Sequence, residues 1–223
     1  MIEIIDINCD FVIIYKPWGM PSQSDPSGDK DAMTETAEAL LAIGEENSLW
    51  LIHRLDRTVG GLLVFARNQR SARELSLAVQ SDVLGKYYLA VTDGLPEGGV
   101  MKDLIYKDAR LSKAFVVDRK RGGVKEAELT LTPISEREGK GLSEVKLKTG
   151  RYHQIRVQLS HRAHPIVGDG KYGSRDKGAR TPALFAYKLE FALFGRAYTY
   201  TKMPSTEEYP WSLFREEIKS EGR

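Results

Sequence analysis

The stretch His53-Arg54-Leu55-Asp56-Arg57-Thr58-Val59-Gly60-Gly61-Leu62-Leu63-Val64-Phe65-Ala66 sets one carboxylate between two arginines, ahead of a glycine pair and an apolar run. The unbroken apolar run from Gly61 to Ala66 predicts a buried strand. The neighbouring cations favour the ionised form of Asp56. A second apolar segment, residues 49–52, precedes it. We therefore expect a charged Asp56 at a turn between apolar segments, where a rigid support can present a reactive group.

Short strands separated by turns dominate the rest of the chain. Apolar or β-branched runs predict strands at 2–7, 11–15, 62–65, 87–91 and 191–194, and period-two alternation predicts two more at 126–132 and 143–148. Helical patterns cover 32–43, 71–79, 152–163 and 211–218, and Ser71 with Glu74 matches a capping box. Residues 22–31 have the composition of a loop. The pattern predicts an α+β fold in a single domain over residues 1–223.

Five motifs in order resemble those of one enzyme family. They are Asp10 to Met20 with Lys16-Pro17-Trp18-Gly19, His53 to Gly61, Lys86-Tyr87-Tyr88-Leu89-Ala90, Gly150-Arg151-Tyr152-His153-Gln154-Ile155-Arg156, and His164 to Asp169 followed by Tyr172-Gly173. The chain resembles the RluA-type pseudouridine synthases, which isomerise uridine in RNA through an essential aspartate. The resemblance implies a mixed, mainly antiparallel central sheet with flanking helices and an RNA-binding cleft. It starts near residue 10, so we expect no S4-type RNA-binding domain.

The resemblance also implies the catalytic residues. Asp56 would act as the nucleophile at the sugar, or as the base that starts a glycal route; the sequence leaves both open. Tyr88 would stack on the target base and is a candidate to help remove the proton from C5. Arg156 would pair with the catalytic carboxylate, a task that suits a bidentate guanidinium. Without the family, an ion-paired aspartate, a core tyrosine and a surface arginine would be the ordinary interpretations.

Further positions are expected to bind substrate. Arg54 and Arg57 flank the aspartate, and Arg151 lies beside Gly150, where a phosphate contact is expected. Leu184 matches the apolar residue that the family places against the base. Two departures from the family pattern lie nearby: residues 58–61 read Thr-Val-Gly-Gly instead of Asp-Thr-Ser-Gly, and Gln158 replaces a frequent histidine. We interpret both as marks of a sub-family that can alter substrate choice.

Charge is distributed unevenly along the chain. The formal net charge is +2, yet residues 101–125 hold eight Lys and Arg against three Asp, and residues 146–180 hold nine against two. Clustered cations are what contact with a phosphate backbone requires, although a charge run alone is usually a solvated surface. With the family resemblance, the expected partner is RNA, specifically a ribosomal or transfer RNA stem-loop.

Several classes of protein are disfavoured. The single cysteine, Cys9, excludes an intramolecular disulfide framework and fits a reducing compartment. The four histidines lack companions at metal-ligand spacing, and the isomerisation needs neither metal nor cofactor, so we expect none. No apolar stretch is long enough to span a membrane, and the start of the chain does not resemble a signal peptide. We therefore expect a cytoplasmic protein without membrane contact, and we expect a monomer.

The sequence thus predicts an RNA pseudouridine synthase, an isomerase. The alternative is a catalytically silent RNA-binding module of the same fold. Retention of Asp56, Tyr88 and Arg156 argues against it, because a carboxylate facing an anionic polymer opposes binding. A hydrolase is disfavoured, because neither a second carboxylate motif nor a Gly-x-Ser-x-Gly elbow is present.

Overall fold

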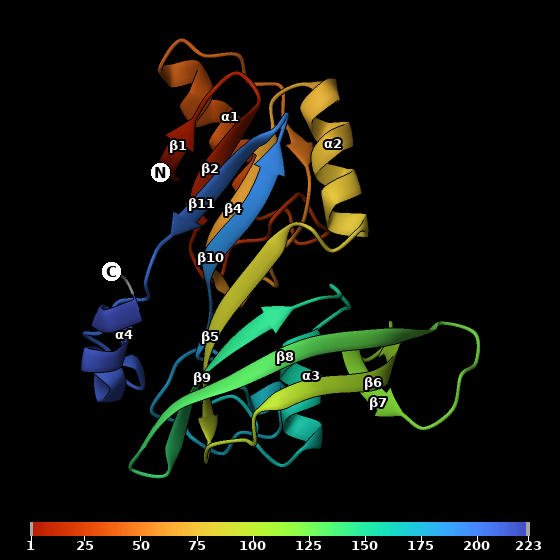
Figure 1. Ribbon diagram of the computed structural model, residues 1–223, viewed down its shortest axis with the longest axis vertical. Helices are drawn as coiled ribbons and strands as arrows, with labels where there is room; N and C mark the ends of the chain where they lie inside the picture. The colour runs from red at the N-terminus through yellow and green to blue at the C-terminus, as the bar shows by residue number, and fades with distance from the viewer. Residues whose placement is uncertain (1, 222–223) are drawn as a thin grey trace. The chain divides into compact units, whose positions relative to one another are not determined.

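The computed structural model describes residues 2–221, and the chain divides into two compact units. The first unit comprises the described part of 1–85 together with Ala186–Lys202, and the second comprises Lys86–Phe185 with the described part of 203–223. Both combine strands and helices (Figure 1), and every strand pair with a described register is antiparallel. The α+β class predicted from the sequence is confirmed, and the single domain stays a prediction.

Four strands in the order β1-β2-β4-β10 form the sheet of the first unit, with β3 paired to β4 and β11 to β10. Its elements are β1 Glu3–Ile7, β2 Phe11–Lys16, α1 Ala32–Ala42, β3 Trp50–Leu51, β4 Gly60–Ala66, α2 Gln69–Gln80, β10 Leu184–Leu193 and β11 Arg196–Thr201. All of β4 is buried, as its unbroken apolar sequence predicts.

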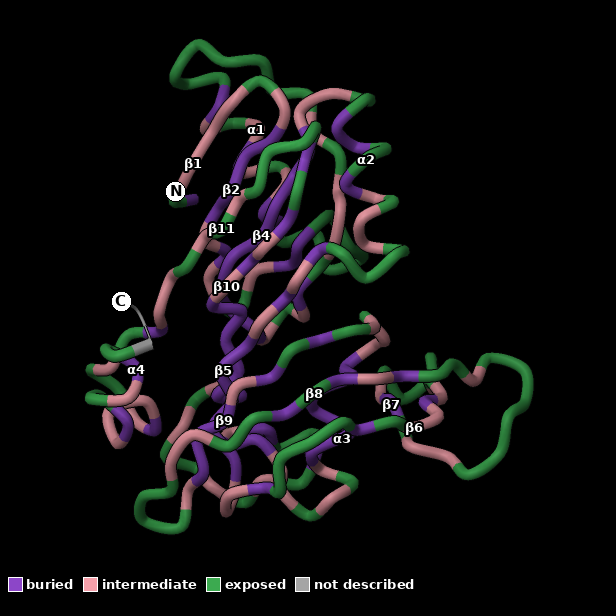
Figure 2. The backbone as a smooth tube through the Cα atoms, viewed as in Figure 1, coloured by how far each residue is buried: buried purple, intermediate pink, exposed green. Residues whose placement is uncertain are grey.

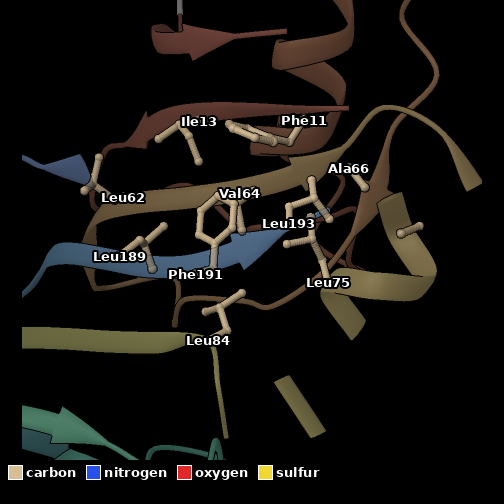
Figure 3. Packing of buried hydrophobic residues seen from close by; sticks show 11 residues of the cluster. Phe11, Ile13, Leu62, Val64, Ala66, Leu75, Leu84, Leu189, Phe191 and Leu193 are labelled. Atoms are coloured by element: carbon tan, nitrogen blue, oxygen red, sulfur yellow. The ribbon is translucent and has the colours of Figure 1, made fainter. Parts of the chain in front are cut away.

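One core cluster joins β2, β4, β10 and α2. Phe11 and Ile13 of β2, with Val64 of β4, share one side of the sheet, because the register sets Ile13 opposite Val64. Figure 3 shows Phe191 of β10 among these side chains, with Leu75 of α2 against them. The Phe11 and Phe191 rings meet edge-on with centroids 5.2 Å apart. This core holds β4, and thereby the chain just before it, in a fixed position.

Helix α2 begins earlier than the predicted capping box would require. Asn68 is the N-cap, and its side chain accepts a hydrogen bond from the Ser71 backbone N–H. Ser71 Oγ instead donates to Asp10 Oδ1 at 2.7 Å, inside the unit. The capping box of Ser71 and Glu74 was therefore wrong. An asparagine in the N-cap position satisfies the same free backbone donors.

The second unit contains the strands β5-β9-β8-β6-β7 in that spatial order. Its elements are β5 Gly85–Asp93, β6 Gly99–Asp108, β7 Lys113–Val117, β8 Val124–Arg137, β9 Lys140–Leu147, α3 Gln154–His161, the 3-10 turns η1 Gly170–Tyr172 and η2 Trp211–Phe214, and α4 Arg215–Glu221. Helix α3 covers part of this sheet through a small cluster that includes Ile105, Ala127 and Val157.

Burial along β8 follows the predicted alternation. Ala127, Leu129 and Leu131 are buried, whereas the residues between them are at least partly exposed (Figure 2). The connection 118–123 between β7 and β8 is exposed throughout. The strands β6 and β7 were not predicted: Lys and Asp interrupt the apolar pattern of β6, and β7 is only five residues long. β6 pairs with both β8 and β7, which supplies the hydrogen bonds that the sequence pattern does not indicate.

Helix α3 is shorter than the predicted 152–163. It begins at Gln154, because the preceding N-cap residue His153 has a left-handed backbone with φ 52°. Positive φ is uncommon for residues other than glycine, although histidine, like asparagine and aspartate, adopts it more often than most. The helix ends at His161.

Candidate active site

The candidate residues fall into two groups, one in each compact unit. Asp56 belongs to the first unit, in the irregular segment between β3 and β4, and is partly exposed. The buried Leu55 backbone N–H donates to Ser22 Oγ and the Leu55 carbonyl accepts from the same hydroxyl, both at 3.0 Å. On the other side, the Val59 N–H donates to the Asp56 carbonyl at 3.0 Å. The backbone is thus held on both sides of the carboxylate.

A buried lysine accompanies this aspartate. Lys16 ends β2, is completely buried, and donates from Nζ to the carbonyls of Pro17 at 2.9 Å and Met20 at 2.7 Å. Burial lowers the pKa of Lys16 to about 7, although the Asp56 carboxylate acts to raise it. When Lys16 is protonated, it is therefore a cation that interacts electrostatically with the Asp56 carboxylate. Lys16 belongs to the Lys16-Pro17-Trp18-Gly19 motif, which assigns it no role by itself. The signal in the sequence that could have found it is a charged residue at the end of an apolar strand.

The turn after Lys16 is attached to the aspartate segment. The Gly19 N–H donates to the Arg57 carbonyl at 2.7 Å, and Gly19 adopts φ 86°, which a glycine accommodates readily. The Arg57 side chain is exposed, pairs with Asp29 and donates from Nη1 to Ser27 Oγ at 3.1 Å. The hydrogen bond from Arg57 lowers the pKa of the exposed Asp29. Arg57 thus ties the loop 22–31 to the segment that carries Asp56.

Arg54, on the other side of Asp56 from Arg57, is exposed.

The glycine at position 61 of the Thr-Val-Gly-Gly run has a structural reason. Gly61 has φ 134°, and a Cβ atom there would lie 2.3 Å from the carbonyl oxygen of Ala186. Only glycine allows β4 to approach β10 this closely. The last glycine of the Thr-Val-Gly-Gly run therefore has a packing function.

In the second unit, Tyr88 lies on β5 opposite Val145 of β9 and is buried. Tyr87 lies on the other side of the strand, opposite Lys146, whose Nζ is 5.4 Å from its ring centroid. Leu184 begins β10 and is buried. The Ala183 carbonyl just before it accepts from the Val91 N–H at 2.9 Å, which fixes this segment against β5.

Arg156 projects from α3 into the interior of the second unit. It is 4% exposed, and its Nε lies 2.6 Å from Asp169 Oδ2 while its Nη2 lies 2.8 Å from Asp169 Oδ1. The Tyr172 ring lies on one side of the guanidinium, 5.0 Å from Cζ to the centroid. Asp169 and Tyr172 belong to the motif His164 to Asp169 with Tyr172-Gly173, but the motif alone assigns neither of them a part in the site.

Arg151 lies in the loop before α3. Its Nε donates to the Glu126 carbonyl at 2.8 Å, and its backbone N–H donates to Gln154 Oε1 at 3.0 Å. It lines a groove of about 730 Å³ whose charges are mixed. The charged side chains around this groove are Lys102, Asp103, Asp118, Glu126, Glu128, Lys148 and Arg151. The groove is therefore less basic than the sequence around it.

Gln158, the second departure from the family pattern, is engaged inside this unit. It is completely buried, and its Nε2 donates to Asp103 Oδ2 at 2.6 Å and to the Met101 carbonyl at 3.3 Å. Asp103 also accepts from Arg162 at the end of α3. Gln158 thus fastens α3 to β6.

Residues 2–221 contain neither a cluster of metal-ligating side chains nor a membrane-spanning helix. No three His, Cys, Asp or Glu side chains in this range come close enough together to hold a metal ion. None of the helices in the described part of the chain has the length and apolar character needed to cross a membrane.

The chain matches known proteins along most of its length. The sequence model of the family described as RNA pseudouridylate synthase matches residues 10–161. The chain is 30% identical over 211 residues to an uncharacterized RNA pseudouridine synthase of Haemophilus influenzae, covering 93% of this chain and 90% of the relative. It is 32% identical over 213 residues to another from Zymomonas mobilis, covering 93% of each.

A solved structure supports the fold. Human RNA pseudouridylate synthase domain containing 4 superposes with a TM-score of 0.79 at 23% identity, covering 96% of this chain and 93% of the human one. The chain belongs to the RNA pseudouridylate synthase family, in its RluA branch. It is an RNA pseudouridine synthase, an isomerase that acts on uridine in RNA.

Proposed function

We propose that Asp56 is the essential carboxylate of this pseudouridine synthase, acting at the sugar carbon of the target uridine as nucleophile or as the base of a glycal route. One observation supports this most: Asp56 is partly exposed on a segment whose backbone is held on both sides, with the Lys16 ammonium in electrostatic contact. A carboxylate on a fixed backbone is preorganised, and a neighbouring cation favours its charged form, as either route requires.

The other catalytic roles follow the family motifs. Tyr88 stacks on the uracil base and takes part in proton removal from C5, and Leu184 supplies apolar contact to the same base. Arg156 serves the Asp56 carboxylate during the reaction, keeping it charged and oriented. Burial of Tyr88 and Arg156 supports these roles, because few alternative conformations are open to a side chain packed on all sides.

The proposed substrate is a stem-loop of ribosomal or transfer RNA. The basic segment 101–125 lies on β6, β7 and the exposed connection that follows. Several of its cations lie over aromatic rings: Lys107 is 4.4 Å from the Tyr152 centroid, and Arg121 is 4.9 Å from that of Tyr106. Basic and aromatic side chains together suit RNA, which is recognised through phosphates and stacked, splayed bases.

Arg54, Arg57 and Arg151 are proposed phosphate contacts. Arg57 would exchange its pair with Asp29 for a phosphate, at small cost because exposed ion pairs contribute little to stability. The enzyme is proposed to act as a monomeric single domain in the cytoplasm, without metal or cofactor.

The test is to delete the gene in its host and map pseudouridine in total RNA with a carbodiimide. The strain is complemented with wild type, with Asp56→Ala, and with Glu74→Ala, which removes an exposed carboxylate on α2 of the same unit. We expect one or a few sites to vanish and to return with wild type and Glu74→Ala only. Restoration by Asp56→Ala would overturn the role of Asp56 and favour the alternative, a silent RNA-binding module.

A further inference from the structure

Trp18 exposes a large indole on a turn that is otherwise tightly held. Its exposed fraction is 55%, whereas Lys16 before the turn and Pro21 after it are buried. Within residues 2–221, neither a ring nor a cation stacks on the indole. An exposed indole adds little to the stability of the fold, because its apolar area stays in water. A single exposed apolar side chain is ordinary, so the argument depends on where Trp18 lies.

The turn under this indole can move little. Lys16 Nζ donates to the carbonyls of Pro17 at 2.9 Å and Met20 at 2.7 Å, and so bridges the two ends of the turn. Between them, the Gly19 N–H donates to the Arg57 carbonyl at 2.7 Å. The backbone that carries the indole is therefore fixed before RNA binds, which reduces the conformational entropy lost on binding.

The same turn lies along the segment of the proposed catalytic carboxylate. The Arg57 carbonyl that accepts from Gly19 belongs to the residue directly after Asp56. On the other side of the carboxylate, the Leu55 backbone exchanges two hydrogen bonds of 3.0 Å with the hydroxyl of Ser22, just beyond the turn. One peptide link joins the indole residue to Gly19, and one joins Arg57 to Asp56. The indole thus belongs to the immediate surroundings of the carboxylate within the first unit.

The surroundings of Trp18 suit a nucleobase that adjoins phosphate groups. A Cβ atom on Gly19 would meet no atom within 4 Å, so this side of the turn is open. Arg54 and Arg57 are exposed on either side of Asp56. Proteins that hold single-stranded nucleic acid combine such cations, which track the backbone, with aromatic side chains on which bases stack. An enzyme that works on a base also takes it out of its stack, which leaves the adjoining bases without a neighbour.

We propose that Trp18 is a stacking platform for an unpaired RNA base that adjoins the target uridine. This rests on the function proposed for Asp56, because the turn lies beside that carboxylate and therefore beside the target. The recognised group is the flat face of a nucleobase, which every base presents, so the platform accepts different bases. Trp18 makes no bond to the reacting atoms. It binds the strand next to them while the target uridine leaves its stack.

The first experiment measures the dissociation constant of a stem-loop RNA that contains the site mapped in the deletion strain. If that strain loses no site, the RNA that the purified enzyme retains from total host RNA serves as the probe. We expect Trp18→Ala to raise the dissociation constant by roughly 5- to 100-fold, the range for one lost base stack, and Trp18→Phe by less than about threefold. The control is Leu41→Ala, which truncates a side chain that is 58% exposed on α1 of the same unit. It should change the constant by less than about twofold.

The second experiment replaces the unpaired nucleotides of the probe, one at a time, by abasic residues. At the stacked position, the wild type should lose roughly 5- to 100-fold in affinity, and Trp18→Ala should lose less than about twofold, because its half of the stack is already missing. At every other position the two proteins should lose the same factor. Stacking should also quench the indole, so RNA should lower tryptophan fluorescence more in wild type than in Trp18→Phe.

Two results would rule out the stack: an unchanged dissociation constant in Trp18→Ala, or equal losses of wild type and Trp18→Ala with every abasic probe. Because the side chain is exposed, Trp18→Ala should melt within roughly 2 °C of wild type. If it does not fold, Trp18→Leu keeps apolar bulk without an aromatic face and must show the same loss. Failure of the proposed function is distinguishable, because wild type would then bind the RNA without forming pseudouridine, while the differences in binding between the variants would remain.

Discussion

The ammonium of Lys16 and the carboxylate of Asp56 interact electrostatically, although they come from different parts of the chain. Lys16 ends the strand β2 and Asp56 follows the strand β3, and β2 and β3 both pair with β4. The lysine is completely buried and the aspartate is partly exposed. The pairing of both strands with β4 thus brings the buried lysine within electrostatic range of the partly exposed carboxylate.

The buried lysine should make stability depend on pH. Burial lowers the pKa of Lys16 to about 7 in the folded protein, so between that value and the unfolded value, roughly 10.4, the unfolded chain binds more protons. Stability of the wild type relative to Lys16→Met should therefore rise with pH across this window, by at most about 1.4 kcal/mol per pH unit. Urea unfolding from pH 6.5 to 9.5 measures it. The difference in unfolding free energy between wild type and Lys30→Met, a change at an exposed lysine, should show no such trend with pH. If the difference between wild type and Lys16→Met stays constant from pH 6.5 to 9.5, the lowered pKa of Lys16 is contradicted.

Two substitutions of Tyr88 should separate its proposed stacking on the base from its proposed part in proton transfer. Tyr88→Phe keeps the ring, so RNA binding should change by less than about threefold, while the single-turnover rate falls by roughly 100-fold or more if the hydroxyl serves as a base. Tyr88→Leu removes the ring and should also weaken binding, because stacking contributes about 1–3 kcal/mol per base. Filter binding and single-turnover assays measure the two effects. Tyr87→Phe is the control. If its single-turnover rate falls more than that of Tyr88→Phe, the catalytic role belongs to Tyr87 and not to Tyr88.

Gly61→Ala should destabilise the first unit severely. The added methyl would lie 2.3 Å from the Ala186 carbonyl oxygen, and φ is already 134°. We expect a loss of about 3–5 kcal/mol or failure to fold. Gly99→Ala is a matched control, because Gly99 has a similar φ of 131° but no atom within 4 Å of the added methyl. Its cost should be confined to backbone strain, about 1–3 kcal/mol. Equal melting temperatures for the two variants would refute the close approach.

Asp176 should make the second unit sensitive to acid. A hydrogen bond from Lys140, joined by one from the Tyr209 hydroxyl at 2.5 Å, lowers the pKa of Asp176 to about 2. A depressed carboxyl pKa stabilises the fold above the unfolded value and loses that contribution as pH falls toward the folded value. Asp176→Asn should therefore be less stable than wild type at pH 6, and the gap should narrow between about pH 4 and pH 2. A difference in stability between wild type and Asp176→Asn that stays constant from pH 6 to pH 2 would contradict this assignment.

Much of the fold could be predicted because local sequence determines it. The apolar run of β4 and the alternation along β8 predicted the burial that the structure shows. The strands β6 and β7 could not be predicted this way, because charged residues interrupt the pattern of β6, β7 has only five residues, and only neighbouring strands complete their hydrogen bonds. The start of α3 depends on one residue, His153, whose left-handed backbone the helical periodicity of the sequence does not indicate.

The sequence by itself determined the family and the candidate catalytic residues, since short motifs such as His53 to Asp56 and Gly150 to Arg156 keep chemistry-bearing side chains at fixed spacing. Only the tertiary structure decided what supports them: Lys16 beside Asp56, and Asp169 with Tyr172 around Arg156. A motif identifies a reactive group by its residue type and its spacing along the chain. Its charge state and orientation depend on burial and on partners that folding brings from other segments, because desolvation and hydrogen bonding are properties of packed surroundings rather than of neighbouring residues.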